Sequence, residues 1–175
     1  MKKVILKKQL QGFLFVSIFG VLLHFLYAWT GESPLVAWFA AVNESIWEHM
    51  KIFFFPQFLY AALESRTLFP QNPDFWCIKL CGTLLGTLLI PVLYYTLSGF
   101  FGTLFDFVNI AIFFISAAAS FWWETKRLRE GDLATCAPQS AIAVFLALAF
   151  LFTMFTFFPP RLPIFEDPLR GTYGI

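Results

Sequence analysis

Charged residues are scarce in this sequence of 175 residues. Asp, Glu, Lys and Arg together make up 13% of the chain, against about 25% in ordinary soluble domains. Hydrophobic residues make up 59%, and phenylalanine alone accounts for 25 positions. A soluble chain of this size needs a polar exterior, which long stretches of this sequence cannot supply. The composition therefore predicts an all-α, multi-pass membrane protein, built as a single integral domain over residues 1–175.

Three further scarcities narrow the classes of function. The formal net charge of +1 lacks the basic excess that nucleic-acid binding requires, so we expect no nucleic-acid partner. Only two histidines are present and no HExxH motif occurs, so one chain cannot build a three-histidine zinc site. Cys77 and Cys81 are one helical turn apart but make a poor metal site without further Cys or His nearby. We expect these two cysteines and Cys136 to stay reduced and unbridged on the cytoplasmic side.

Long apolar runs predict five transmembrane helices. A helix needs about 20 predominantly apolar residues to span a bilayer. The stretches that meet this need are residues 10–29, 46–64, 80–97, 103–123 and 138–158. No A-x-A-like cleavage site closes the first run, so we interpret it as an uncleaved span rather than a signal peptide. The tail at 159–175 is polar and contains Pro and Gly, so no regular structure is expected there.

The second apolar region, from Leu35 to Glu64, is too long for one simple span. Ser45 and Glu48 are spaced as in the capping box that starts many helices. We therefore expect the second span to begin at residue 46. Residues 34–42 should then form a short interfacial or re-entrant helix in front of it.

The basic residues predict which side of the membrane each loop occupies. With a cytoplasmic N-terminus, the basic residues inside are Lys2, Lys3, Lys7, Lys8, Arg66, Lys79, Lys126, Arg127 and Arg129. Only Arg161 and Arg170 then lie in the tail outside. Because Lys and Arg gather in cytoplasmic loops, we expect a multi-pass protein of the cell (plasma) membrane, with its N-terminus in the cytoplasm and its C-terminus outside.

With this topology, the polar residues within the predicted apolar spans gather near the outer side of the membrane. His24 precedes the outer end of the first span by about five residues, and His49 follows the start of the second by about four, which places both at a similar depth. Asp106 and Asn109 enter from the outer end of the fourth span. Ionisable groups inside a bilayer are costly, so this clustering indicates a functional site.

Two short motifs carry most of these polar residues. The first is Asn43-Glu44-Ser45-x-Trp47-Glu48-His49-x-Lys51, and the second is Asp167-Pro168-x-x-Gly171-x-Tyr173-Gly174. With these motifs, nearly the whole chain resembles an uncharacterised family of small prokaryotic multi-pass membrane proteins, a domain of unknown function. The resemblance implies a membrane location and no particular activity.

The favoured hypothesis is an outward-facing pocket that binds a lipid or other amphipathic ligand, with or without a chemical step. In this hypothesis His49 is the general acid or base, and Glu48 or Glu44 is its carboxylate partner. Lys51 would hold an anionic head group. The remaining candidates for ligand contact are Asn43, Ser45, Asp106, Asn109, Asp167, Arg170 and Tyr173. Membrane lipid is the expected partner, and the sequence names no cofactor and no oligomeric state.

Three alternatives stay open. The first is a metal site, whose candidate ligands are His24, Glu44, Glu48 and His49, and the matching depth of the histidines also allows a bis-histidine haem. The second is a small oligomeric transporter or channel, which a broken second helix would suit. The third is a purely structural role, in which Ser45 and Glu48 cap a helix and Lys51 extends to the membrane surface.

Overall fold

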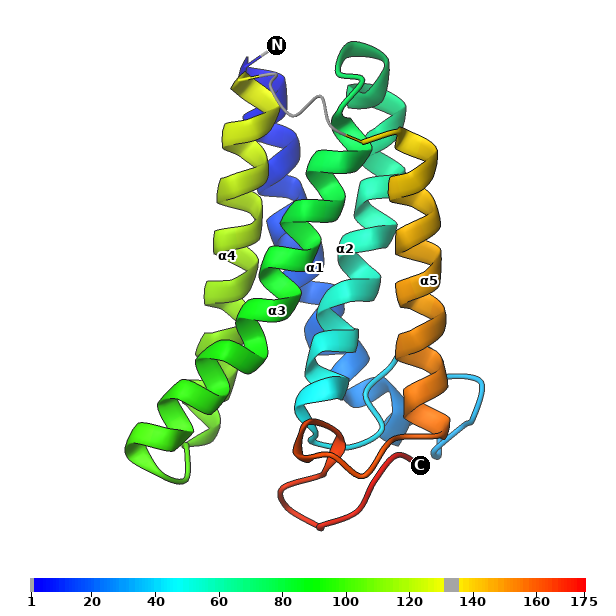
Figure 1. Cartoon of the computed structure of the whole chain (residues 1–175), viewed down its shortest axis with the longest axis vertical. Helices are drawn as coiled ribbons and strands as arrows, with labels where there is room; N and C mark the ends of the chain where they lie inside the picture. Colours follow the sequence, from blue (N-terminus) through cyan, green and yellow to red (C-terminus); the bar gives the residue numbers. More distant parts are fainter. Residues whose placement is uncertain (1, 131–135) are drawn as a thin grey trace.

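The computed structural model describes residues 2–130 and 136–175, which are predominantly helical. The long helices form an up-and-down bundle in which neighbours along the chain run antiparallel (Figure 1). They are α1 (Lys2–Trp29), α2 (Ile46–Leu68), α3 (Phe75–Phe101), α4 (Asp106–Glu130) and α5 (Pro138–Phe157), and the single turns η1 (Phe69–Gln71) and η2 (Pro163–Phe165) follow α2 and α5. The described residues contain no strand, so the predicted all-α class is confirmed.

Four of these helices, α1, α3, α4 and α5, are long and apolar enough to cross a membrane. Four of the five predicted spans therefore lie in helices of the required length and composition, and α2 is not among these helices. α2 is less apolar because it carries Glu48, Lys51 and Glu64, and all three side chains are buried within the bundle. α2 contacts each of the other four long helices. It is thus the central helix, and these polar residues face protein.

Aromatic side chains and glycines pack the helices around α2. Phe53 and Phe54 of α2 are fully buried, and the ring of Phe54 lies 6.0 and 5.0 Å from the rings of Phe145 and Phe152 of α5, centroid to centroid. α3 approaches α2 closely because Gly86 has no side chain and leaves room for Phe53. In a membrane, where lipid is as apolar as phenylalanine, such close packing is a principal force between helices.

The segment between α1 and α2 differs from the sequence prediction. Residues 34–42, expected to form a short helix, contain consecutive turns, in which Ala37 N and Ala40 N each donate to the carbonyl four residues earlier. The pattern does not continue, because Ala41 N donates instead to Leu23 O of α1, 3.1 Å away. The segment is therefore a compact loop tied to α1.

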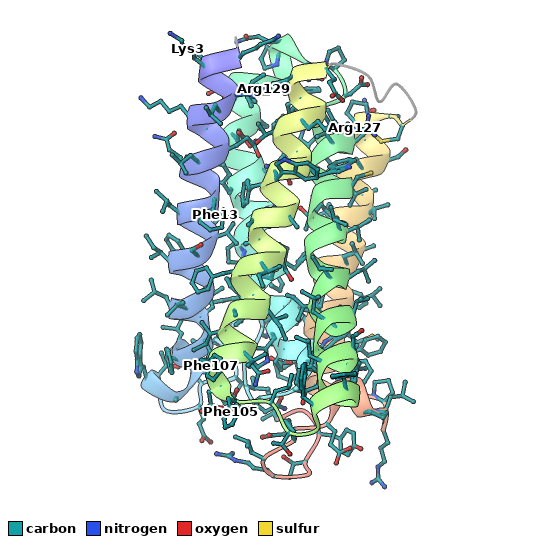
Figure 2. All side chains as sticks on the ribbon, turned by 90° about the vertical axis from the view of Figure 1, so that its left-hand side faces the viewer. Lys3, Phe13, Phe105, Phe107, Arg127 and Arg129 are labelled. Carbon is teal, nitrogen blue, oxygen red and sulfur yellow. A yellow bond between two sulfur atoms is a disulfide. The ribbon has the colours of Figure 1, made fainter. Side chains whose placement is uncertain are left out.

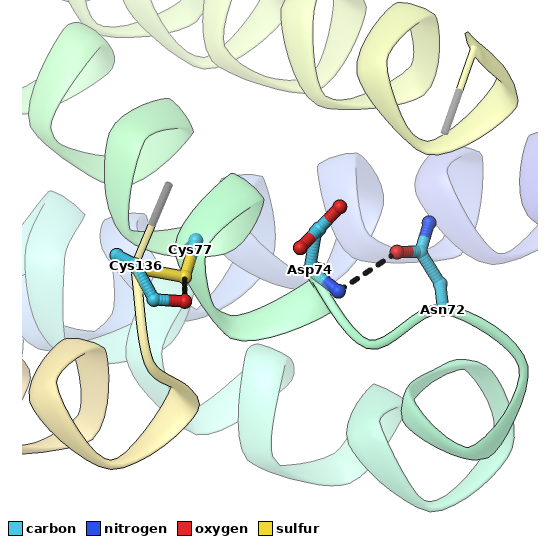
Figure 3. The surroundings of a disulfide bond; sticks show 4 residues. All are labelled: Asn72, Asp74, Cys77 and Cys136. Atoms are coloured by element: carbon cyan, nitrogen blue, oxygen red, sulfur yellow. Dashed lines mark hydrogen bonds between the residues drawn. A yellow bond between two sulfur atoms is a disulfide. The ribbon is translucent and has the colours of Figure 1, made fainter. Parts of the chain in front are cut away.

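A disulfide joins Cys77, in the first turn of α3, to Cys136, just before α5 (Figure 3). The prediction that the cysteines stay unbridged is therefore wrong for this pair, whereas Cys81 is free and exposed. The prediction rested on cellular compartment alone. The fold brings the two segments to the same end of the bundle with Cα atoms 6.1 Å apart, which a disulfide can bridge. Beside the bond, Asn72 Oδ1 accepts a hydrogen bond from Asp74 N.

Loss of this disulfide should destabilise the protein. The bond joins residues 59 apart in the sequence, and a cross-link of this kind typically contributes about 2–4 kcal/mol to the free energy of unfolding. We expect Cys77→Ser to lower the thermal midpoint and to make it insensitive to reductant, while Cys81→Ser behaves like the parent. A parent midpoint that is equal with and without reductant would contradict the bond.

The two ends of the bundle differ in chemistry. The end with the N-terminus carries Lys3, Arg127 and Arg129, whereas the exposed rings of Phe105 and Phe107 lie at the other end (Figure 2). The loop between α1 and α2 and the C-terminal tail also lie at this second end (Figure 1). Three of the basic residues predicted to share one side of the membrane are therefore found together.

Candidate functional site

Two histidines and a glutamate from separate segments meet near the end of the bundle that holds the tail. His24 lies near the end of α1, Glu44 in the loop before α2, and His49 in the first turn of α2. Glu44 Oε2 lies 3.4 Å from His24 Nε2 and 3.7 Å from His49 Nε2. The two imidazole centroids are 5.2 Å apart. In this His24–Glu44–His49 cluster, Glu44 rather than Glu48 is the carboxylate beside the rings.

The start of α2 explains how the loop presents Glu44. Ser45 caps the helix as predicted, because its hydroxyl accepts from Glu48 N at 3.3 Å. The amide of Ser45 donates to Asn43 Oδ1 at 2.9 Å, which fixes the turn on either side of Glu44. The reciprocal bond of the capping box is replaced, since the Glu48 carboxylate accepts from Val42 N at 3.1 Å instead.

His49 is oriented by the main chain. Its Nδ1 atom lies 2.8 Å from Ser45 O. Because a carbonyl oxygen only accepts, the neutral imidazole carries its hydrogen on Nδ1 and presents the lone pair of Nε2 toward Glu44. His24 Nδ1 is buried and finds no hydrogen-bond partner among the described residues. The main-chain contact of His49 Nδ1 leaves Nε2 of this residue suited to act as a base or as a metal ligand.

Glu44 supplies negative charge to the site. The hydrogen bond with His24 is the largest cause that lowers the pKa of Glu44 below its ordinary value. The positive charges of Arg170 and of His24 and His49, when these are protonated, act in the same direction. Partial burial opposes them. The side chain is 41% exposed, so the carboxylate is ionised at neutral pH and accessible to a ligand.

The cluster forms one wall of a pocket of about 400 Å³ between α1, α2 and α4. The lining is mostly apolar and includes Val21, Phe25, Ile110, Phe113, Phe114 and Leu169. Asp106 and Asn109 of α4 add polar groups. Asn109 Oδ1 is buried and has no hydrogen-bond partner within the described part of the chain. An apolar pocket with a few convergent polar groups is the usual form of a small-molecule site.

Glu48 and Lys51 form an internal ion pair and do not line this pocket. Lys51 Nζ lies 2.6 Å from Glu48 Oε2 and donates to Ala37 O at 2.9 Å and to Thr156 Oγ1 at 2.7 Å. Thr156 Oγ1 in turn donates to Glu48 Oε1 at 2.6 Å. An ammonium has three hydrogens, so Lys51 is fully engaged. The pair joins α2 to the preceding loop and to α5, and it leaves Lys51 unable to reach a head group as the sequence suggested.

The two sequence motifs meet through Asn43 and Gly174. Asn43 Nδ2 donates to Gly174 O at 3.0 Å. Gly174 has a positive φ of 66°, and a Cβ at this position would lie 2.6 Å from Thr156 O, so only glycine fits the contact. Tyr173 donates to Glu166 Oε2 at 3.0 Å and therefore braces the tail internally rather than reaching the cluster.

The tail covers part of the pocket through a turn built by Asp167. Its Oδ1 atom accepts from Leu169 N at 2.9 Å, and its main-chain oxygen accepts from Gly171 N at 2.8 Å. This turn places Leu169 against the pocket. Arg170 is exposed and influences Glu44 through its charge. Asp167 is thus a buried support for the tail, and Arg170 remains at the surface.

Sequence reasoning missed a third polar group, formed by Glu64, Lys79 and Glu124, which are buried inside the bundle. The sequence placed these residues at loop boundaries because α2, α3 and α4 extend beyond the predicted spans. A signal was available in α4, where Ser116, Ser120 and Glu124 recur every four residues of an apolar helix and so share one face.

A protein-family model spans almost the entire chain. The model of the family of unknown function DUF6512 matches residues 2–175. The chain belongs to this family. The predicted resemblance to a family of unknown function is therefore confirmed, and the DUF6512 match covers both the bundle and the His24–Glu44–His49 cluster. No curated protein and no solved structure matches the chain.

Proposed function

We propose that the protein binds an amphipathic molecule of the membrane, with its polar end at the His24–Glu44–His49 cluster and its apolar part between α1 and α4. The observation that carries this proposal is a pocket with apolar walls and one polar side. The walls come from α1 and α4, which are both apolar enough to face lipid, so a ligand can enter from the bilayer.

The polar atoms of the pocket favour a head group that donates hydrogen bonds. Glu44 is an anion, His49 Nε2 presents a lone pair, and Asn109 Oδ1 is a buried acceptor. Asp106 adds a second carboxyl group. Lys51 is engaged elsewhere. A hydroxyl or ammonium group therefore fits this end better than the anionic head group expected from the sequence.

A pocket-filling substitution tests this proposal. Val21 lines the pocket, whereas Val4 is on the same helix and is equally exposed at 45% but lies outside the pocket. Binding of a fluorescent long-chain amine, alcohol and phosphate is measured on the protein in mild detergent. We expect the parent and Val4→Trp to bind the amine and the alcohol in preference to the phosphate, and Val21→Trp to bind at least about tenfold more weakly, a loss of about 1.4 kcal/mol. Equal binding by both tryptophan variants would refute the pocket.

A divalent metal ion is the second candidate, favoured by the distances within the cluster. In a tetrahedral zinc site with bonds of about 2.0–2.1 Å, neighbouring ligand atoms lie about 3.3–3.4 Å apart. The observed separations from Glu44 are 3.4 Å to His24 and 3.7 Å to His49, longer than the about 2.7–2.9 Å of a strong charge-assisted hydrogen bond. All three ligand atoms lie within 4.8 Å of one another. Such an ion would leave a fourth position for the polar end of the ligand.

We also propose that all five long helices cross the membrane, with the N-terminus in the cytoplasm and the tail outside. Lys3, Arg127 and Arg129 lie at the N-terminal end, and such residues mark the cytoplasmic side. The Cys77–Cys136 disulfide lies at the same end and favours the opposite orientation, because disulfides persist in oxidising compartments. Charge acts while the helices insert, so we expect it to set the orientation.

Reporter fusions decide between these orientations. Alkaline phosphatase, which is active only outside the cytoplasm, should be active when fused after Ile175 and inactive when fused before Met1. The reverse pattern would place the disulfide outside and the ligand pocket on the cytoplasmic side. Activity at both termini, or at neither, would contradict an odd number of spans.

A further inference from the structure

Lys79 lies between two carboxylates in the interior of the bundle. Its Nζ atom is 3.0 Å from Glu64 Oε2 and contacts Glu124 Oε2 directly. The three side chains come from α3, α2 and α4, and each has an exposed fraction of 0%. We refer to Glu64, Lys79 and Glu124 as the buried triad. It is separate from the ligand pocket and shares no residue with its lining.

Neutral groups surround the triad. From α1, Gln9 Nε2 donates to Glu64 Oε1 at 2.9 Å, and from α2, Gln57 Nε2 donates to Glu124 Oε1 at 2.9 Å. The rings of Tyr60 and Phe121 face the ammonium, with centroids 5.7 and 5.0 Å from Lys79 Nζ. The hydroxyl of Tyr60 donates away from the triad, to Lys8 O at 2.6 Å.

The charges of the triad do not balance. Two carboxylates and one ammonium sum to a net charge of −1, and among the described residues no second cation lies within 4.0 Å of either carboxylate. An uncompensated charge buried inside a membrane protein is energetically costly. One bound proton removes it. We propose that the buried triad is a proton-binding site, in which Glu64 and Glu124 share one proton taken from water while Lys79 stays charged.

A small cavity lies about one helical turn from the triad, toward the N-terminal end. The cavity has a volume of about 20 Å³ and is lined by Ile5, Leu68 and Leu128, among others. Ile5 precedes Gln9 by four positions, and Leu68 and Leu128 follow Glu64 and Glu124 by four positions. Four positions are about one helical turn. A volume of this size is about enough for one water molecule. We expect a proton that exchanges with solvent through this cavity to pass its apolar side chains.

A line of buried hydroxyl groups continues from the triad toward the other end. Ser120 Oγ accepts from Gln57 Nε2 at 2.9 Å and donates to Gly82 O at 2.7 Å. Beyond it, Ser116, Thr83 and Thr87 are buried, and their hydroxyl groups have no hydrogen-bond partner in the described residues. Toward the pocket, the ring of Phe113, which lines it, packs against the buried ring of Phe53 with centroids 5.8 Å apart. We therefore expect the triad to exchange its proton at the N-terminal end.

Infrared spectroscopy of the purified protein across a pH titration tests this site. At neutral pH the parent should show the carbonyl band of one protonated carboxyl group per chain. Glu64→Gln and Glu124→Gln should each lose this band, because one carboxylate and one ammonium remain and they balance without a proton. Glu130→Gln, an exposed position on α4, is the control and should keep the band.

The parent spectrum alone can refute the proposal, so the test does not depend on the variants folding. Absence of a protonated carboxyl band in the parent at neutral pH overturns it, and so does a band that persists in both glutamine variants. Lys79→Met gives a further check, because two carboxylates without a cation should bind two protons and raise the band about twofold. The ligand-binding test above reads a different site, so either proposal can fail alone.

Discussion

Glu48→Gln should lower the free energy of unfolding by about 3–5 kcal/mol, the usual cost of removing one partner of a buried ion pair. The substitution leaves the ammonium of Lys51, which has an exposed fraction of 0%, without its counter-ion. It also weakens the bonds that the carboxylate accepts from Val42 N and Thr156 Oγ1. A residue that only capped α2 would tolerate the change at less than about 1 kcal/mol. Thermal and denaturant unfolding in detergent separate the two expectations.

The double substitution Glu48→Gln with Lys51→Met should be more stable than Glu48→Gln alone. Removing both charges also removes the uncompensated ammonium, and buried ion pairs replaced together by neutral groups often cost little. Glu32→Gln, at an exposed position in the preceding loop, is the control and should unfold like the parent. The single variant Lys51→Met completes the comparison. If the double variant loses as much unfolding free energy as Glu48→Gln and Lys51→Met lose when added together, a direct Glu48–Lys51 interaction is contradicted.

His49→Ala should lower the affinity for zinc at least about 100-fold, because loss of a residue that merely orients a metal ligand costs about 10–100-fold. Glu44→Gln should have a comparable effect, since it removes the carboxylate that contacts both histidines. Both residues are only partly buried, so the protein should remain folded. Calorimetric titration of metal-free protein with zinc measures the affinity, and thermal unfolding confirms the fold.

Asp74→Asn is the matched control for this titration, because Asp74 precedes α3 at the opposite end of the bundle. It should bind zinc like the parent. Zinc affinity should also fall on acidification, since ligand histidines and carboxylates must be deprotonated. Equal zinc affinity of the parent and His49→Ala would remove the metal candidate. The amphipathic-ligand proposal would then be tested by the comparison of Val21→Trp with Val4→Trp alone.

Local chemistry made part of this site predictable. Ser45 lies directly before an apolar run, and its role as a helix cap follows from spacing alone. The partner of Glu48 could also have been predicted from the sequence. Residues three apart on a helix face each other and adjacent ones do not, which favours Lys51 over His49. The contact of Glu44 with His24 was harder to predict. It depends on the path of an irregular loop that is tied to α1.

The remaining features depend on contacts between residues far apart in the chain. Glu64 and Glu124 contact Lys79 only because α2, α3 and α4 pack together, and at the ends of apolar runs such residues resemble ordinary solvated charges. The Cys77–Cys136 disulfide likewise depends on where α3 and α5 begin. The composition predicted the helical class because its high apolar content indicates that the chain lies in a membrane. Composition does not indicate which buried charged residues contact one another.

An experimental density map of the protein in a lipid bilayer disc tests the central proposal most directly. We expect elongated density in the pocket, with one end within hydrogen-bonding distance of Glu44 or His49 and the remainder along Val21 and Ile110. A compact peak between His24, Glu44 and His49 would add the metal ion. A pocket that contains no density beyond scattered solvent, in a map that resolves lipid on the outer faces of α1 and α4, would contradict the proposed function.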